Sequence, residues 1–185
     1  RGSMAAVGIG YKQIVKMLPE SIEVACHNSA DSCTISGPSA EVAEFVASLK
    51  AKNIFAKEVP CSNIAYHSRY IAHMGPQLLA YLKTIIPNPQ ERTSKWLSSS
   101  VPKADWDEPQ RKLCSAEYHT NNLLCSVLFE ETFALLPTNS LTIEIAPHGL
   151  LQAIVKRSMP GGVHIPLTQR GNKDNAVFFL TALGK

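Results

Sequence analysis

The order of apolar runs in the first 60 residues is the feature that most restricts how this chain can fold. Glycine, proline or turn-favouring residues bound each run, and the apolar spacing changes from that of a strand to that of a helix and back. Strands are predicted at Met4–Ile9, Ile22–Cys26, Cys33–Ser36 and Ile54–Val59, with helices over Tyr11–Leu18 and from Pro38 to Leu49. This order is the split-βαβ, ferredoxin-like pattern, and we expect a subdomain of that type over residues 4–60. Many unrelated binding modules share the pattern, so it specifies no chemistry.

Two local features refine this prediction. The stretch from His27 to Ser32 is rich in turn-favouring residues and should join the second and third strands as a hairpin loop. Pro38 suits the first position of the following helix, where its missing N–H leaves no hydrogen bond unmade.

After Pro60 the pattern becomes one of strands alternating with helices. A long amphipathic helix is predicted from Tyr70 to Ile86, with a kink at Pro76. Further on we expect strands at Trp96–Val101, Leu141–Ile145 and Val163–Leu167, helices at Leu123–Leu135, Leu150–Arg157 and Ala176–Leu183, and a polar connection over Lys103–Ser115. Such alternation predicts a largely parallel α/β sheet covered on both faces, over residues 61–185. The strands are few for so many helices.

Composition excludes several classes of function. The 185 residues carry a net charge of +3 without a run of basic residues, so we expect no nucleic-acid partner. No segment reaches the roughly 18 consecutive apolar residues that a spanning helix needs, so no membrane partner is expected. The five cysteines never form a C-x-x-C pair, which indicates free thiols, no metal site and a cytoplasmic location.

A nucleophile for covalent acyl chemistry is missing from the pattern. Such chemistry needs a serine or cysteine at a sharp strand-to-helix turn with small neighbours, as in G-x-S-x-G, and that motif does not occur. The segment that comes nearest to this motif is Gly37-Pro38-Ser39-Ala40-Glu41. Because the second glycine is absent, Ser39 is better interpreted as a first-turn helix residue with an ordinary capping role.

The histidines are the remaining candidates for acid–base chemistry. His67 stands in the short apolar stretch Ile64-Ala65-Tyr66-His67-Ser68, and taken alone such a histidine is more often a structural or surface residue than a catalytic one. His73 should be exposed on the long helix. His148 follows Pro147 at a strand-to-helix turn, where capping is favoured over lining a site.

The other histidines and the late basic residues offer weaker patterns. His27, His119 and His164 show no partner pattern in the sequence. Lys156, Arg157, Arg170 and Lys173 could meet phosphates or an acidic carrier surface, but a solvated face is the favoured interpretation.

Three blocks in fixed order carry a resemblance to a known family. They are Ala65-Tyr66-His67-Ser68, Asn121-Asn122-Leu123-Leu124-Cys125-Ser126-Val127-Leu128-Phe129 and Ile143-Glu144-Ile145-Ala146-Pro147-His148-Gly149-Leu150-Leu151. Together they resemble the acyl-CoA:carrier-protein acyltransferases. Ala25-Cys26-His27-Asn28-Ser29, Thr34-Ile35-Ser36-Gly37-Pro38 and Phe55-Ala56-Lys57-Glu58-Val59 are similar to the malonyl/acetyl transferase domain of animal-type fatty-acid synthase in particular.

The resemblance implies a fold, a reaction and roles for three residues. It implies an α/β-hydrolase-like acyltransferase core with a ferredoxin-like insert, and ping-pong transfer of malonyl or acetyl groups from CoA to carrier-protein phosphopantetheine, with no permanently bound cofactor. His67 matches the general base. In the family a main-chain carbonyl oxygen near the N-N-L block orients that imidazole, and Asn122 is the matching position. Tyr66 matches the residue that borders the acyl pocket, where the family usually has phenylalanine.

The resemblance also implies that essential parts lie elsewhere. In the family the serine elbow, an oxyanion-hole glutamine and a malonyl-pairing arginine all precede the ferredoxin-like insert, and none is found here. We therefore expect no nucleophile in residues 1–185, no turnover by this chain alone, and partners that include the carrier-protein domain, neighbouring synthase domains and the N-terminal acyltransferase segment. One alternative remains open, a non-catalytic module that docks a carrier protein or adjoining domain. A freestanding ferredoxin-like regulatory or RNA-binding domain is disfavoured by the three matching blocks and by the absence of interleaved aromatic residues on the strands.

Overall fold

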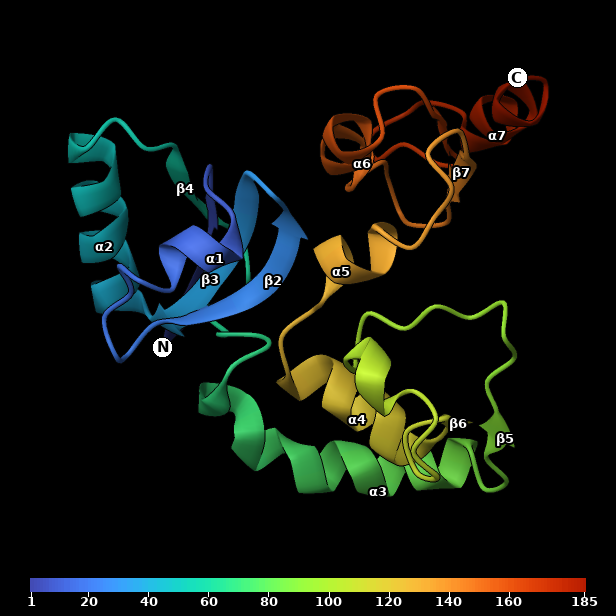
Figure 1. Cartoon of the computed structure of the whole chain (residues 1–185), viewed down its shortest axis with the longest axis horizontal. Coiled ribbons are helices and arrows are strands. Elements are labelled where there is room, and N and C mark those ends of the chain that lie inside the picture. The colour runs from blue at the N-terminus through green and yellow to red at the C-terminus, as the bar shows by residue number, and fades with distance from the viewer. The chain divides into compact units, whose positions relative to one another are not determined.

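An antiparallel four-stranded sheet occupies the start of the chain in the computed structural model, which describes residues 1–185 (Figure 1). The strands are β1 (Gly2–Val7), β2 (Glu23–Ser29), β3 (Ser32–Pro38) and β4 (Ala56–Val59), and they lie in the order β2-β3-β1-β4. Helix α1 (Tyr11–Ile14) follows β1, and α2 (Ser39–Ala51) follows β3. This is the predicted strand-helix-strand-strand-helix-strand order with the ferredoxin-like strand arrangement.

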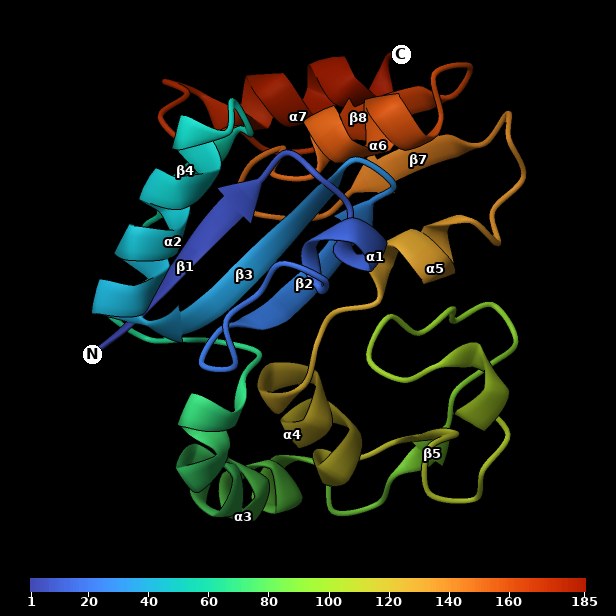
Figure 2. The same cartoon turned by 60° about the vertical axis from the view of Figure 1, so that its left-hand side comes forward.

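One hydrophobic cluster joins this sheet to its helices. Val7 and Ile35 of the sheet pack in the same cluster as Ile14 of α1 and Val42 and Leu49 of α2, and none of the five is more than 1% exposed. Figure 2 shows α2 lying along the face of β1 and β3. Burial of aliphatic side chains from four elements is the main stabilising contribution here.

Three details differ from the sequence prediction in this part. Helix α1 ends at Ile14 and is followed by turns, so the helix predicted to Leu18 is wrong in its second half. The hairpin is tighter than predicted, because β2 continues to Ser29 and β3 begins at Ser32. Pro38 is the N-cap of α2 rather than its first helical residue, and it is still extended, with φ −61° and ψ 138°.

The long helix predicted after residue 60 is composite. Arg69–Met74 form a 3₁₀ helix, η1, and α3 (Gly75–Ile85) begins directly afterwards. Pro76 lies in the first turn of α3 and therefore starts that helix instead of kinking it. Helix α3 packs against α4 (Ala116–Leu124).

Two further predictions for this region are wrong. Trp96–Val101 form no strand, and the helix predicted over Leu123–Leu135 is interrupted, since α4 ends at Leu124 and α5 covers Phe129–Phe133. The intervening backbone leaves the helix to pair with β2: Val127 N–H donates to Ala25 O at 2.8 Å, and His27 N–H donates to Val127 O at 2.8 Å. The polar connection contains a 3₁₀ turn, η2 (Lys103–Asp105), and the short strands β5 (Gln90–Glu91) and β6 (Leu113–Cys114) pair around it.

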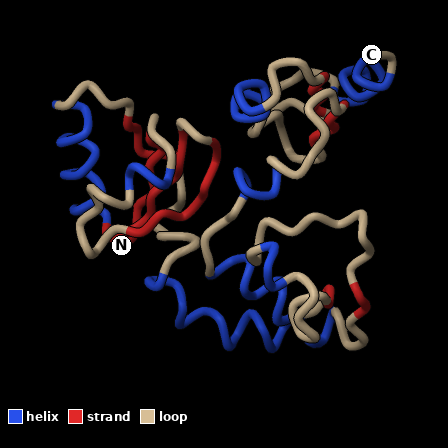
Figure 3. The backbone as a smooth tube through the Cα atoms, in the orientation of Figure 1, coloured by secondary structure: helices blue, strands red, loops and turns tan.

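The chain divides into two compact units, Arg1–Thr132 and Phe133–Lys185. The second unit contains β7 (Leu141–Glu144) and β8 (Val163–Pro166), which pair in parallel as predicted, and helices α6 (Gln152–Ser158) and α7 (Asn175–Leu183). Its strands and helices are coloured separately in Figure 3. A subdomain boundary near residue 60 remains a proposal, because the sheet and the helical segment up to Thr132 belong to the same unit.

Candidate active site

His67 lies in an irregular segment between β4 and η1 and has an unusual backbone conformation. Its φ is +56°, in the left-handed region that residues with a β-carbon rarely adopt. The neighbours on both sides are firmly held: Ala65 and Ser68 are each 2% exposed, and Ser68 Oγ donates to Ala65 O at 2.6 Å. Strained backbone kept in place by its surroundings is concentrated at functional sites.

The start of β1 also fixes this segment. Gly2 N–H donates to Asn63 O at 2.8 Å, and a β-carbon at Gly2 would collide with the backbone of Ala65. The absence of a side chain at Gly2 therefore lets the segment that carries His67 pass directly over the end of the strand.

The C-terminus of α4 supplies the partners of His67. The His67 N–H donates to Leu123 O at 3.2 Å, and His67 Nδ1 lies 3.1 Å from Cys125 O. The backbone of Asn122 also acts on the imidazole, since it raises the pKa of the ring. The last carbonyl groups of a helix have no partner within the helix, so they are available to accept these hydrogen bonds.

This arrangement defines the tautomer of His67. A carbonyl oxygen can only accept a hydrogen bond, so Nδ1 must carry the proton, and the neutral ring presents an unprotonated Nε2. Burial lowers the pKa of His67 below its usual 6.5, while the hydrogen bonds to the carbonyls of Cys125 and Asn122 act in the opposite direction. At neutral pH the ring is a neutral base with its accepting nitrogen free.

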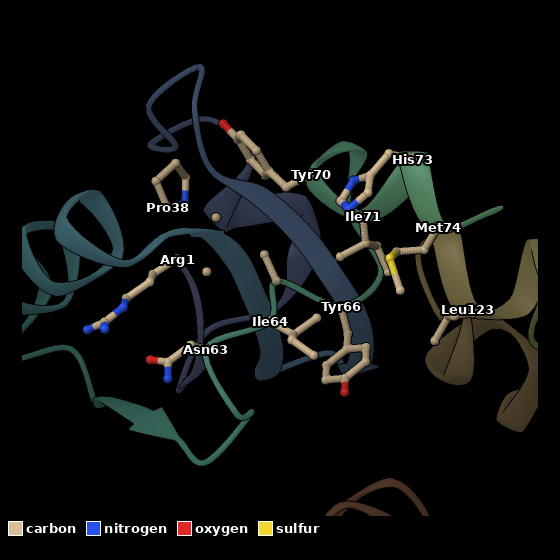
Figure 4. Close-up of a pocket in the computed structure, with 13 residues that line it drawn as sticks. Arg1, Pro38, Asn63, Ile64, Tyr66, Tyr70, Ile71, His73, Met74 and Leu123 are labelled. Atoms are coloured by element: carbon tan, nitrogen blue, oxygen red, sulfur yellow. The ribbon is translucent and has the colours of Figure 1, made fainter. Parts of the chain in front are cut away.

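Tyr66 lies on a pocket of about 580 Å³ within the first unit. Apolar side chains dominate its wall, and Figure 4 shows Ile64, Tyr66 and Ile71 among the residues that line it. His73 also lines it and is exposed, as the sequence predicted. The pocket thus brings together Tyr66 and His73, whereas the ring of His67 is directed to the end of α4.

The candidate nucleophiles are poorly placed for acyl chemistry. Ser39 is the first residue of α2, as predicted, but it does not cap the helix, and its Oγ is buried without a hydrogen-bond partner. Burial raises the pKa of the Cys26 thiol to about 11 and that of Cys33 to about 12, so both stay protonated at neutral pH. The hydrogen-bond partner of the His67 ring is the main-chain carbonyl of Cys125 rather than a hydroxyl or a thiol.

Three histidines have partners that the sequence did not reveal. His27 stacks on Tyr11 with ring centroids 3.7 Å apart, and its Nδ1 lies 2.6 Å from Glu131 Oε1. His119 Nε2 lies 3.5 Å from Cys114 Sγ. His164 contacts Thr142 Oγ1 at 2.8 Å and Met159 O at 2.9 Å. Each of these contacts joins separate elements, so the residue pattern within one element does not reveal it.

His148 does not cap the helix that follows it. The carboxylate of Glu144 reaches this turn instead and accepts from Leu151 N–H at 2.9 Å and from Gln152 Nε2 at 2.8 Å. His148 lines a polar pocket of about 340 Å³ in the second unit together with Arg170. The basic residues noted in the sequence, Lys156, Arg157, Arg170 and Lys173, are all exposed.

Two classes of site can be checked over the whole chain. No group of three or more His, Cys, Asp or Glu side chains is arranged to hold a metal ion. None of the helices combines the length and the apolar character required to cross a bilayer.

Comparison with known proteins identifies the family. Residues 1–185 match the model of the acyl transferase domain, and the chain belongs to that family. A highly reducing polyketide synthase (g433) of Fusarium sp. is 29% identical over 98% of this chain, and a low-reducing polyketide synthase (drtA) of Aspergillus calidoustus is 33% identical over 85%. The chain spans 7% of the length of each.

Solved structures share the fold at low identity. The loading acyltransferase of the avermectin modular polyketide synthase superposes with a TM-score of 0.81 at 22% identity, covering 99% of this chain and 58% of that one. The acyltransferase domain from module 8 of the salinomycin polyketide synthase gives a TM-score of 0.79 at 20% identity, covering 99% and 44%. The predicted α/β acyltransferase fold is therefore confirmed. These relatives are polyketide synthases, so the comparisons support the acyltransferase family and not a fatty-acid synthase in particular.

Proposed function

We propose that this chain is part of an acyltransferase domain that moves malonyl and acetyl groups from CoA to the phosphopantetheine thiol of a carrier protein, with His67 as general base. One observation carries the proposal. The His67 ring is bonded through Nδ1 to the end of α4, so Nε2 is free to accept a proton.

The proposed reaction has two balanced half-steps. A serine hydroxyl from the part of the domain outside this chain attacks the CoA thioester, its proton passes to His67 Nε2, and the CoA thiolate leaves and takes that proton. The carrier-protein thiol then gives its proton to Nε2 as its sulfur attacks the acyl-serine ester, and the serine oxygen leaves and is reprotonated.

Asn122 and Tyr66 have supporting roles in this proposal. The main-chain carbonyl of Asn122 helps to hold the imidazole where the aspartate of a triad would do so elsewhere. Tyr66 borders the acyl group through the pocket that it lines. No permanent cofactor is needed.

The exposed apolar surface of the second unit supports an incomplete catalytic domain over an independent docking module. Ile145 is 87% exposed and Ile143 is 52% exposed, beside a parallel sheet of only two strands. Parallel sheets are normally buried on both faces. We propose that other segments of the same domain cover these residues, and that the carrier protein and neighbouring domains are the remaining partners.

The parent is proposed to be an animal-type fatty-acid synthase in the cytoplasm. The blocks around Cys26, Gly37 and Lys57 support the choice of synthase. All five cysteines are free, which supports a reducing compartment. A polyketide synthase is the alternative parent, in line with the known relatives.

Transfer of radiolabelled acyl groups to carrier protein tests the proposal. The complete domain should load both malonyl and acetyl groups, as a synthase needs an extender and a primer, and residues 1–185 alone should load neither. His67→Ala should lower kcat by at least about 10³-fold, as removal of a catalytic base does. His119→Asn is the control, because it removes another imidazole, one on α4 itself, and leaves the carbonyl contacts of His67 intact.

Each contrary result has a definite meaning. Full transfer by residues 1–185 alone would show that Ser39 or a cysteine is a nucleophile. Retention of transfer in His67→Ala would reject His67 as the base, and a domain that loads malonyl but not acetyl groups would favour a polyketide synthase as the parent.

A further inference from the structure

A run of three serines, Ser98–Ser100, lies against α4, the helix whose end bonds His67, and the first and third of them are buried. Ser98 is 1% exposed and Ser100 is 5% exposed, although the segment has no regular secondary structure. Buried polar groups must find partners, and those of this run find them on α4 and α5. Asn121 Nδ2 donates to Ser100 O at 2.8 Å, and Ser98 Oγ and Tyr118 OH are 2.7 Å apart.

The same serine run also bonds to the chain that follows the break between α4 and α5. Leu128 N–H donates to Ser99 O at 2.7 Å, and Thr132 Oγ1 donates to Ser98 O at 2.8 Å. The break at Cys125 therefore lies between two segments that are tied to one serine run. Cys125 matters because its carbonyl oxygen faces His67 Nδ1.

Asn122 connects the serine run to the carbonyl groups that bond His67. Its side-chain Nδ2 donates to Ser100 Oγ at 2.5 Å. The residues that follow it carry the two carbonyls: Leu123 O accepts from His67 N–H at 3.2 Å, and Cys125 O lies 3.1 Å from His67 Nδ1. The contacts therefore run from the Ser100 hydroxyl through Asn122 to the end of α4 and from there to His67.

We propose that Ser100 is a positioning residue for His67, acting through its hydrogen bond to the Asn122 side chain. The Ser100 hydroxyl fixes the rotation of the last turn of α4, and with it the direction of the carbonyl groups that keep the proton on Nδ1. The effect of Ser100 on catalysis rests on the proposed function, whereas its effect on the position of the His67 ring does not.

Imidazole ¹⁵N NMR of the complete acyltransferase domain measures the tautomer of His67. Ser100→Ala should increase the fraction of His67 with the proton on Nε2. It should also lower kcat for malonyl transfer about tenfold, because loss of a hydrogen bond that orients a metal-ligating side chain lowers activity by about 10- to 100-fold and the lower value is expected here. KM should change less than about twofold, because the hydroxyl is not expected to touch substrate. Ser100→Thr, which keeps the hydroxyl, should restore both the spectrum and kcat.

Two further variants separate positioning from general loss of structure. Ser99→Ala removes a hydroxyl from the same run and keeps the backbone bond to Leu128, so its spectrum should match the unsubstituted domain. Asn122→Ala keeps the main-chain carbonyl and should reproduce Ser100→Ala. The double variant should be no worse than either single one, because both remove the same contact.

The outcomes are distinguishable. An unchanged His67 tautomer in a folded Ser100→Ala domain, or additive losses in the double variant, would overturn the positioning role. Should Ser100→Ala fail to fold, Asn122→Ala carries the same test from the other side of the bond. If His67→Ala keeps full transfer while Ser100→Ala still shifts the tautomer, the proposed function fails and the structural link stands.

Discussion

At the scale of single residues, the ionisation of His67 is governed by two opposing effects. Burial disfavours the charged imidazolium, whereas the carbonyl groups of Cys125 and Asn122 favour it, and burial is the larger effect. The folded-state pKa is therefore lower than the 6.5 of an exposed histidine. The ring remains neutral over the pH range in which a general base has to work.

This lowered pKa predicts how the stability of the protein depends on pH. Below pH 6.5 an unfolded chain binds a proton at His67 more readily than the folded chain does, so stability is fully present above 6.5 and is lost as the pH falls toward the folded pKa. Urea unfolding at pH 7.5 and pH 5.5 measures this loss. His67→Gln cannot titrate and should lose less stability between the two pH values. Equal losses in both proteins would contradict the assignment.

At the scale of elements, α4 begins with a side-chain cap. Ser115 precedes the helix in an extended conformation, and its Oγ accepts from Tyr118 N–H at 3.1 Å. The cap satisfies one of the free N–H groups at the start of the helix whose other end holds His67.

Removal of this cap should weaken the domain measurably. Ser115→Ala is expected to lower the free energy of unfolding by about 1 kcal/mol, the usual cost of losing a serine N-cap. Chemical denaturation gives the difference. Ser48→Ala is the control, because its hydroxyl bonds to Phe45 O inside α2 and alanine is a better helix former, so a change within about 0.5 kcal/mol is expected. A loss in Ser48→Ala equal to that in Ser115→Ala would show that the cap has no special role.

Elements built from local contacts were predictable from the sequence, and those decided by distant contacts were not. The order of strands and helices up to Val59 follows from apolar spacing, because neighbouring elements bury one another's side chains. The apolar spacing of Leu123–Leu135 gave no sign of a break at Cys125. That break is stabilised by pairing with β2, about a hundred residues earlier, where Ser126 Oγ also donates to Val24 O at 2.7 Å.

The candidate site shows the same division. His67 and Asn122 could be singled out from the sequence, since each stands in a block that resembles the acyltransferase family. Ser100 could not, because Trp96–Val101 resembles a strand and its polar groups bond to helices that fold against it. The residues next to Ser100 in the sequence do not mark it as functional, so its role can be inferred only once its hydrogen-bond partner is known.

At the scale of the whole molecule, the second unit exposes more apolar surface than an isolated domain should. Four side chains of α7 and two of β7 are at least 39% exposed: Val177, Phe179, Leu180, Leu183, Leu141 and Ile143. Exposed apolar surface of this kind marks a place where other protein packs. The chain covers 44% and 58% of two solved acyltransferases with the same fold, which leaves ample further sequence in such a domain to cover it.

Hydrogen exchange tests the proposal that a further part of the acyltransferase domain covers this surface. Peptides from β7 and α7 should exchange more slowly in the complete domain than in residues 1–185 alone, because added strands and side chains would bury their amides. Peptides from β3 and α2 should exchange equally in both, since that cluster is already closed in this chain. Mass spectrometry after timed labelling compares the two samples directly. Equal exchange of β7 in both would show that its exposed face is not where the domain continues, and the independent docking module would then become the better account of this chain.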